Sequence, residues 1–359
     1  MKINKKTFLI LIIAIIVIVA ILFFIFYKKD TGTIFNSGKV VDNETTSPFL
    51  PNGATIINKD LNTGIVIKDK NNNEWVWIEV PKTVTAKANT DKEIEEALEN
   101  YVKVDSTGKG ELISNKQGHT DAYHEGIGLT KEQYNIKKSE ILKSIKENGG
   151  FYIGRYETGH IVSEGETSRL SSGKTIQVPV IQKDAYPYIY VTNEQAEKLS
   201  ESFSTEDTKC SLMLGIQYDL VFKYFNVKGK ITPKELTQDS TKIGNYSNNK
   251  DLNITSTNVK KLGLTKTSWE TVPVGKLDIK EEPALLTTGA SDDAKILNLY
   301  DIAGNIFEWT LEKGLDKNNP CAYIGGSYRD MGSGTPCSKR VATTKTESRD
   351  YIGFRATMY

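Results

Sequence analysis

The chain has 359 residues, with 46 basic and 45 acidic side chains and a formal net charge of +1. Because this balance lacks the basic excess that nucleic-acid binding requires, we expect no nucleic-acid partner. The length fits one large domain with an N-terminal appendage.

The N-terminal segment contains an uncharged apolar run of twenty residues, Phe8 to Tyr27. At about 1.5 Å per residue, a helix of this length spans the roughly 30 Å of a bilayer hydrocarbon core. The run is too long for a signal peptide, and no small-residue cleavage pattern follows it. More positive charge precedes the run than follows it, which favours a cytoplasmic N-terminus. Residues 1–29 are therefore predicted to be a cytoplasmic N-terminus and transmembrane anchor. We expect a single-pass protein of the cell membrane with an extracytoplasmic C-terminal domain.

Residues 30–55 are rich in Thr, Ser, Asn and Gly, which predicts a flexible stalk. The globular domain is then expected to span residues 56–359. Strands are predicted at 65–67 and 75–80, where Trp75 and Trp77 share a face that we expect in the core. Helical periodicity and capping signals predict helices at 91–102, 130–149, from Thr192, at 211–225 and from Thr232. After about residue 240 the composition favours long loops with short strands.

The chain has three cysteines, at positions 210, 321 and 337. An odd count leaves at least one thiol unpaired within the chain. Outside the cytoplasm Cys321 and Cys337 are candidates for a disulfide, whereas Cys210 lies beside an apolar stretch and is predicted to be a buried thiol. The three histidines form no metal-ligand motif, and we expect His160 at the surface.

Leu299 to Thr310 reads LYDIAGNIFEWT, which sets an Asp, an Asn and a Glu among apolar residues. This segment closely resembles the signature of the formylglycine-generating enzyme family, also called the sulfatase-modifying factor family. WVWIEV, GGFYIGRYETG, PYIYVTNEQAEKL, IGGSY and the terminal GFR follow the family order. The resemblance implies an α+β, C-type lectin-like fold of short twisted sheets with few helices and much loop, preceded here by one transmembrane helix.

The resemblance also implies a calcium site in this segment, because family members bind calcium there through oxygen ligands. By position, the ligands would be the side chains of Asp301 and Glu308 and the backbone carbonyls of Gly304 and Ile306. The alternative is that Asp301 and Asn305 cap a turn and Glu308 pairs with a basic residue. Structural roles are expected for Asn305, Trp309, Gly325, Gly326, Gly353 and Arg355. The Arg355 guanidinium is expected to need a carboxylate or carbonyl partner.

The catalytic resemblance fails just after GGSY. Family members that make formylglycine bind copper(I) through two nearby cysteines, because that ion prefers thiolates. Here the segment reads GGSYRDMGSGTPCSKR, so Arg329 or Asp330 replaces the first cysteine and Cys337 is displaced from the second. We therefore expect no copper cofactor and no catalytic residues.

Three functions stay open at the level of the sequence. The first is a non-catalytic domain that binds an unknown protein, peptide or glycan through the loops Lys228–Val272 and Arg329–Tyr351. The second is a divergent oxidase or maturation enzyme acting on exported proteins, which would need a reactive Cys337. The third is a structural component of the cell envelope.

Overall fold

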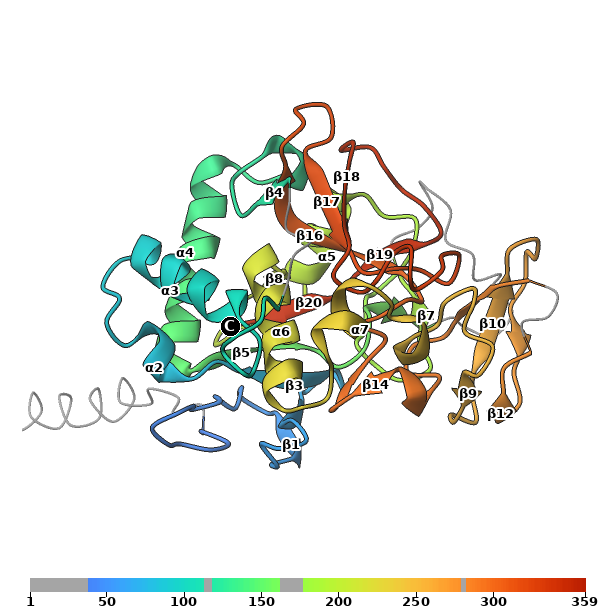
Figure 1. Cartoon of the computed structure of the whole chain (residues 1–359), viewed down its shortest axis with the longest axis horizontal. Coiled ribbons are helices and arrows are strands. Elements are labelled where there is room, and N and C mark those ends of the chain that lie inside the picture. Colours follow the sequence, from blue (N-terminus) through green and yellow to red (C-terminus); the bar gives the residue numbers. More distant parts are fainter. Residues whose placement is uncertain (1–37, 113–117, 162–176, 279–281) are drawn as a thin grey trace, which may run out of the picture. The chain divides into compact units, whose positions relative to one another are not determined.

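In a computed structural model of the chain, residues 38–112, 118–161, 177–278 and 282–359 are described. The predicted membrane span at Phe8 to Tyr27 lies outside these residues. Among the residues that are described, no helix is long and apolar enough to cross a membrane. Residues 39–359 form one compact unit that combines several short sheets with few helices and much loop (Figure 1).

The largest sheet in the described part of the chain is antiparallel and has the strand order β1-β2-β3-β5-β20-β8. Its strands are β1 (Thr55–Asn58), β2 (Val66–Lys68), β3 (Glu74–Glu79), β5 (Gly150–Gly154), β20 (Ala356–Met358) and β8 (Cys210–Leu212). Side chains alternate between the two faces of β3, so Trp75 and Trp77 pack in one apolar cluster while Val76 and Ile78 pack in another. Both tryptophans are buried, as predicted.

A second sheet carries the LYDIAGNIFEWT segment. It has the order β18-β17-β16-β19, and β4 also pairs with β16. Its strands are β4 (His119–Thr120), β16 (Phe307–Gly314), β17 (Cys321–Ile324), β18 (Arg340–Thr343) and β19 (Ile352–Phe354). Strands β16 and β19 run parallel, with Glu308 opposite Gly353 and Trp309 opposite Phe354. This pairing brings the two family motifs, FEW and GFR, together.

The remaining strands form small ribbons, most of them after residue 240 as the composition predicts. They are β6 (Gly159–His160) with β7 (Tyr186–Pro187), β9 (Asn253–Ile254) with β12 (Gly275–Lys276), β10 (Lys260–Gly263) with β11 (Glu270–Thr271) and β13 (Ala284–Leu286), and β14 (Lys295–Ile296) with β15 (Leu299–Tyr300). In Figure 1, β9, β10 and β12 lie at the right-hand edge of the domain, away from α3 and α4.

The helices begin largely where the local capping signals place them. They are α2 (Lys82–Thr85), α3 (Asp91–Lys103), α4 (Lys131–Asn148), α5 (Asn193–Glu201), α6 (Gly215–Val227) and α7 (Pro233–Thr237), with 3₁₀ turns η1 (Glu125–Ile127), η2 (Thr241–Ile243) and η3 (Asp292–Ala294). Thr130, Thr192 and Thr232 each form a complete capping box at the N-terminus of a helix. Gly149 ends α4 in the left-handed conformation, with φ +70°.

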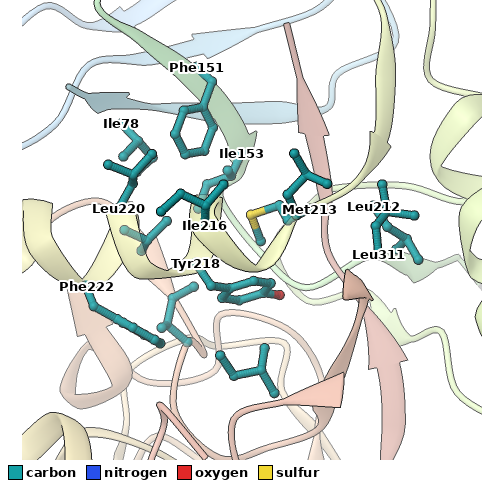
Figure 2. Close-up of a cluster of buried hydrophobic side chains, with 14 of the residues drawn as sticks. Ile78, Phe151, Ile153, Leu212, Met213, Ile216, Tyr218, Leu220, Phe222 and Leu311 are labelled. Atoms are coloured by element: carbon teal, nitrogen blue, oxygen red, sulfur yellow. The ribbon is translucent and has the colours of Figure 1, made fainter. Parts of the chain in front are cut away.

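The buried helix predicted at 211–225 is wrong in its first part. Residues 210–212 form strand β8, which adds to the edge of the large sheet beside β20, and the helix begins only at Gly215. The tertiary pairing with β20 overrides the local apolar pattern here. Helix α6 is buried along nearly its whole length, and Figure 2 shows Ile216 and Leu220 of α6 beside Ile78, Phe151 and Ile153 of the large sheet.

The stalk prediction is also wrong for the residues of 30–55 that are described. Thr46 and Ser47 are fully buried, and Trp77 donates from Nε1 to Thr46 Oγ1 at 2.8 Å. The Ser47 backbone amide donates to the carbonyl of Asn148 at the end of α4. A buried indole N–H needs an acceptor, and this polar segment supplies it. Residues 39–55 therefore belong to the domain.

Candidate functional site

The LYDIAGNIFEWT segment runs from β15 through a tight turn into β16. Asp301, Gly304 and Asn305 all have positive φ, at 59°, 73° and 57°. A Cβ on Gly304 would lie 2.5 Å from the carbonyl oxygen of Asn245, so this position combines a left-handed backbone with a close approach. The turn is therefore fixed by packing against Asn245 rather than by its own residues alone.

Asn305 links three segments through its buried side-chain amide. It donates to Glu157 Oε2 at 2.6 Å, and its Oδ1 accepts from the Leu286 amide at 3.1 Å and from Asn245 Nδ2 at 3.0 Å. Glu157 also accepts from the Ile306 amide at 3.2 Å. Burial, followed by repulsion from neighbouring carboxylates, raises the pKa of Glu157 well above its ordinary value.

Glu308 pairs with Arg355 at the centre of the domain. Arg355 donates to Glu308 Oε1 from Nε at 3.0 Å and from Nη2 at 2.7 Å, and it also donates to the carbonyls of Gly154 and Tyr300, each at 2.9 Å. The hydroxyl of Tyr218 on α6 donates to Glu308 Oε2. Both arginine and carboxylate are buried, so the predicted carboxylate partner of Arg355 is confirmed.

These contacts bear on the predicted calcium site. Arg355 and Tyr218 engage both oxygens of Glu308, and the guanidinium charge opposes a cation at the same carboxylate. Asp301 accepts from the Gly289 amide at 2.7 Å, and burial raises its pKa to about 6. In the part of the chain described, no three His, Cys, Asp or Glu side chains are placed to hold a metal ion. The arrangement does not fit calcium and instead favours the ion-pair alternative.

A second buried arginine lies where β18 meets α6. Arg340 donates from Nε to Glu312 Oε1 at 2.8 Å and from Nη2 to Asp219 Oδ1 at 2.7 Å. Burial raises the pKa of Glu312 to about 7, against the opposing effect of Arg340. The sequence analysis did not single out Arg340, Asp219 or Glu312. Alternation along β16 was the available signal, because Glu308, Thr310 and Glu312 share one strand face.

In the loop after GGSY, Arg329 and Asp330 occupy the region of the first of the two family thiol positions. Asp330 caps the loop, with its carboxylate accepting from Ser327 Oγ at 2.5 Å and from the Ser327 amide at 3.1 Å. The Arg329 guanidinium lies over the rings of Tyr328 and Tyr351, 5.5 and 5.4 Å from their centroids, and pairs with Asp350. Stacking and pairing together hold the guanidinium in a fixed orientation at the edge of the domain.

The three cysteines are buried and free, so the structure lacks the predicted Cys321–Cys337 disulfide. Cys337 Sγ lies against the carbonyl of Leu236 near the end of α7, whereas Cys321 lies against Gly126 of η1. The two thiols thus pack on different segments. Burial raises the pKa of both Cys321 and Cys337 to about 12. Cys210 is buried, as predicted.

The contacts of the remaining motif residues indicate structural roles. Trp309 donates from Nε1 to the Val191 carbonyl at 2.9 Å. Gly325 has φ +95°, and a Cβ on Gly326 or Gly353 would lie 2.4–2.5 Å from a neighbouring side chain. His160 is not at the surface as predicted, because it is buried between the rings of Tyr186 and Tyr188.

The fold and the paired motifs define a class of protein. Residues 157–358, more than half of the chain, match the sulfatase-modifying factor enzyme 1-like domain. The chain therefore belongs to the formylglycine-generating-enzyme, or sulfatase-modifying factor, family. The match begins at Glu157, just after strand β5, and includes the motifs from there to GFR.

Solved structures give distant likenesses. Treponema denticola variable protein 1 is 12% identical over 58% of this chain and 84% of that chain, with a TM-score of 0.31. PvdO from Pseudomonas aeruginosa is 14% identical over 59% of this chain and 81% of that chain, also with a TM-score of 0.31. CarF is 23% identical over 23% of this chain, with a TM-score of 0.20, and the aligned part spans 30% of the CarF chain. No curated protein gives a significant match.

Proposed function

We propose that this protein is a non-catalytic member of its family that binds a protein, peptide or glycan outside the cytoplasm. It would be held at the cell membrane by Phe8 to Tyr27. The observation that carries the proposal is that Arg329, beside the first of the family's thiol positions, is held in an ion pair with Asp350.

The chemistry of this loop supports a binding role. Copper(I) requires soft ligands, whereas a guanidinium is a cation and repels metal ions. The one thiol in the loop, Cys337, is 1% exposed, and burial raises its pKa to about 12. The thiolate is the nucleophile and the metal ligand, so Cys337 is nearly all in its inert form near neutral pH. A divergent oxidase, the alternative function, would need a reactive thiol here.

The same loop offers a recognition surface. The Arg329 side chain is 36% exposed, and the Arg349 side chain is 56% exposed two residues before Tyr351. An arginine held by flat aromatic rings presents several donors at low entropic cost, which suits carboxylate, sulfate or hydroxyl groups of a ligand. The loop Lys228–Val272 remains the second proposed contact region, because loops on a rigid scaffold commonly carry binding residues.

Two measurements test the proposal. The full chain is incubated with copper(I), oxygen and a cysteine-containing peptide, and mass spectrometry follows conversion of the cysteine to formylglycine. We expect no conversion, and a product that disappears in the Cys337→Ala variant would overturn the proposal.

The second measurement places a photo-crosslinking residue at the exposed Thr346 in living cells.

The crosslinking experiment needs a matched pair of variants. We expect an adduct that weakens in Arg329→Ala and persists in Lys317→Ala, which removes a cation from the β16–β17 turn instead of this loop. Adduct formation that is equal in both variants would remove Arg329 from the binding surface. An excess of a glycan or peptide that binds this surface should reduce formation of the adduct.

A further inference from the structure

Three partly exposed aromatic side chains surround one small apolar cluster beside the loop after GGSY. The cluster consists of five buried residues: Ile189, Leu262, Leu285, Ile306 and Tyr328. Tyr190, Trp269 and Tyr351 pack against it, and each stays partly exposed. We call these three residues the aromatic rim. Trp269 belongs to the loop Lys228–Val272 and Tyr351 ends the loop Arg329–Tyr351, so the two proposed contact loops meet at this cluster.

Neighbouring groups hold the aromatic rim in place. The Tyr190 backbone amide donates to the carbonyl of Arg349 at 3.0 Å, which joins Tyr190 to the segment that carries Tyr351. The Trp269 ring meets the Tyr186 ring edge to face, with the two centroids 4.8 Å apart. Rigid aromatic side chains lose little conformational entropy when a ligand binds, so the aromatic rim is a preorganised contact surface.

Tyr190 adopts a backbone conformation that tyrosine rarely takes. Its φ is +58°, in the left-handed region that suits glycine and asparagine. Strained residues of this kind cluster at ligand-binding sites. A glycine or asparagine at this position would avoid the strain, so the aromatic side chain is the feature that the strained position retains.

Each member of the aromatic rim has an ion pair beside it, either at the next residue of the chain or, for Tyr190, through its contact with the segment before Tyr351. The pairs are Arg329–Asp350, Arg349–Glu347 and Lys266–Glu270. Each pair joins one cation and one anion, so the three pairs bring no net charge to the surface. They place hydrogen-bond donors and acceptors side by side around the rings.

We propose that the aromatic rim binds an uncharged oligosaccharide of β-linked, gluco-configured rings. In such rings the hydroxyl groups are equatorial, so each face exposes C–H groups that can lie flat on an aromatic side chain. The hydroxyls at the ring edge both donate and accept, and the flanking ion pairs supply partners of both kinds. This inference rests on the proposed function and narrows its ligand to one class.

Two other ligand classes fit this surface less well. A strongly anionic ligand would meet the three carboxylates of the ion pairs as well as their cations. A flat protein partner would remove water from the pairs, and that desolvation costs free energy unless each lost hydrogen bond is replaced. Sugar hydroxyls replace the water directly, because each one is both a donor and an acceptor.

The test is a calorimetric titration of the full chain with cellohexaose and with chitohexaose, which are uncharged β-1,4-linked hexamers. A detergent without a sugar head group keeps the apolar N-terminal run in solution without competing for the site. We expect saturable binding of at least one hexamer. A heparin hexasaccharide, which is strongly anionic, should bind more weakly than that hexamer.

Two variants and a matched control locate the site. Trp269→Ala and Tyr190→Asn should each weaken binding by roughly tenfold, as the loss of one aromatic contact implies. Asparagine tolerates the left-handed backbone, so the second variant removes a ring without adding strain. Tyr123→Ala is the control, because Tyr123 is also partly exposed but packs against Tyr134 of α4. Its affinity should equal that of the wild type.

The inference is overturned if neither hexamer binds, if heparin binds more tightly than both, or if Tyr123→Ala weakens binding as much as Trp269→Ala. Circular dichroism checks that each variant is folded. Where a variant fails to fold, saturation-transfer NMR of the wild type decides: transfer from aromatic protons to the hexamer supports the site, and its absence refutes it. A protein adduct that depends on Arg329, with no hexamer bound, would refute this inference and leave the proposed function standing.

Discussion

The Arg355–Glu308 pair gives the sharpest test of how this domain is held together. Replacing Arg355 by Met keeps much of the side-chain volume and removes every hydrogen bond that the guanidinium donates. The carboxylate of Glu308, whose side chain is 4% exposed, would keep Tyr218 as its one hydrogen-bond partner among the described residues. The carbonyls of Gly154 and Tyr300 would lose the donors that now lie 2.9 Å away.

Removing one partner of a buried ion pair costs about 3–5 kcal/mol, because an uncompensated charge stays inside the protein. Domains of this kind have unfolding free energies of about 5–15 kcal/mol, so the loss is a large fraction of the total. Urea unfolding followed by tryptophan fluorescence measures it, since Trp75, Trp77 and Trp309 are fully buried. The double variant Arg355→Met, Glu308→Leu should recover part of the loss, because no charge is then left unpaired.

The matched control is an exposed ion pair. Lys198 and Glu194 lie 2.6 Å apart on α5, with side chains 64% and 48% exposed. Lys198→Met should change the unfolding free energy by less than about 1 kcal/mol, because solvent screens the pair. If Arg355→Met lowers the unfolding free energy no more than Lys198→Met, the buried pair does not stabilise the centre of the domain.

Burial raises the pKa of Glu312 to about 7, so folding favours its protonated form. The stability that this group contributes is complete below its ordinary pKa of 4.5 and is lost as the pH rises through 7. Melting temperatures should therefore vary less between these pH values in Glu312→Gln than in the wild type, and an unchanged slope would contradict this. Gly304→Ala should destabilise the domain by more than Gly108→Ala. Both glycines have φ near +70°, but only the first would place its Cβ against Asn245, and urea unfolding of both variants separates the clash from the backbone strain. A thiol reagent should leave the native chain unlabelled and label all three cysteines in urea, whereas a single labelled thiol would reveal a disulfide. Calcium at about 1 mM, a concentration that saturates many extracellular calcium modules, should leave the melting temperature unchanged, and a rise that Glu308→Gln abolishes would restore the calcium site.

The local signals of the sequence located several helices well. Threonine followed three residues later by glutamine or glutamate predicts the starts of α4, α5 and α7, because a capping box is satisfied within one turn of chain. The same local signals do not show which segment will pair with the edge of a distant strand such as β20. The apolar run at 211–225 therefore looked helical throughout, although its first residues pair with β20.

The sequence by itself determined the family, the order of the motifs and the need of Arg355 for a partner. It also showed that the loop after GGSY lacks the thiol pair. These features depend on residue types at fixed local spacing. Only the tertiary structure decided that Glu308 pairs with Arg355, that Glu157 binds Asn305 and that the aromatic rim surrounds one apolar cluster. Buried polar groups pair with whatever distant segment the fold brings within hydrogen-bond reach, and no local pattern records that choice.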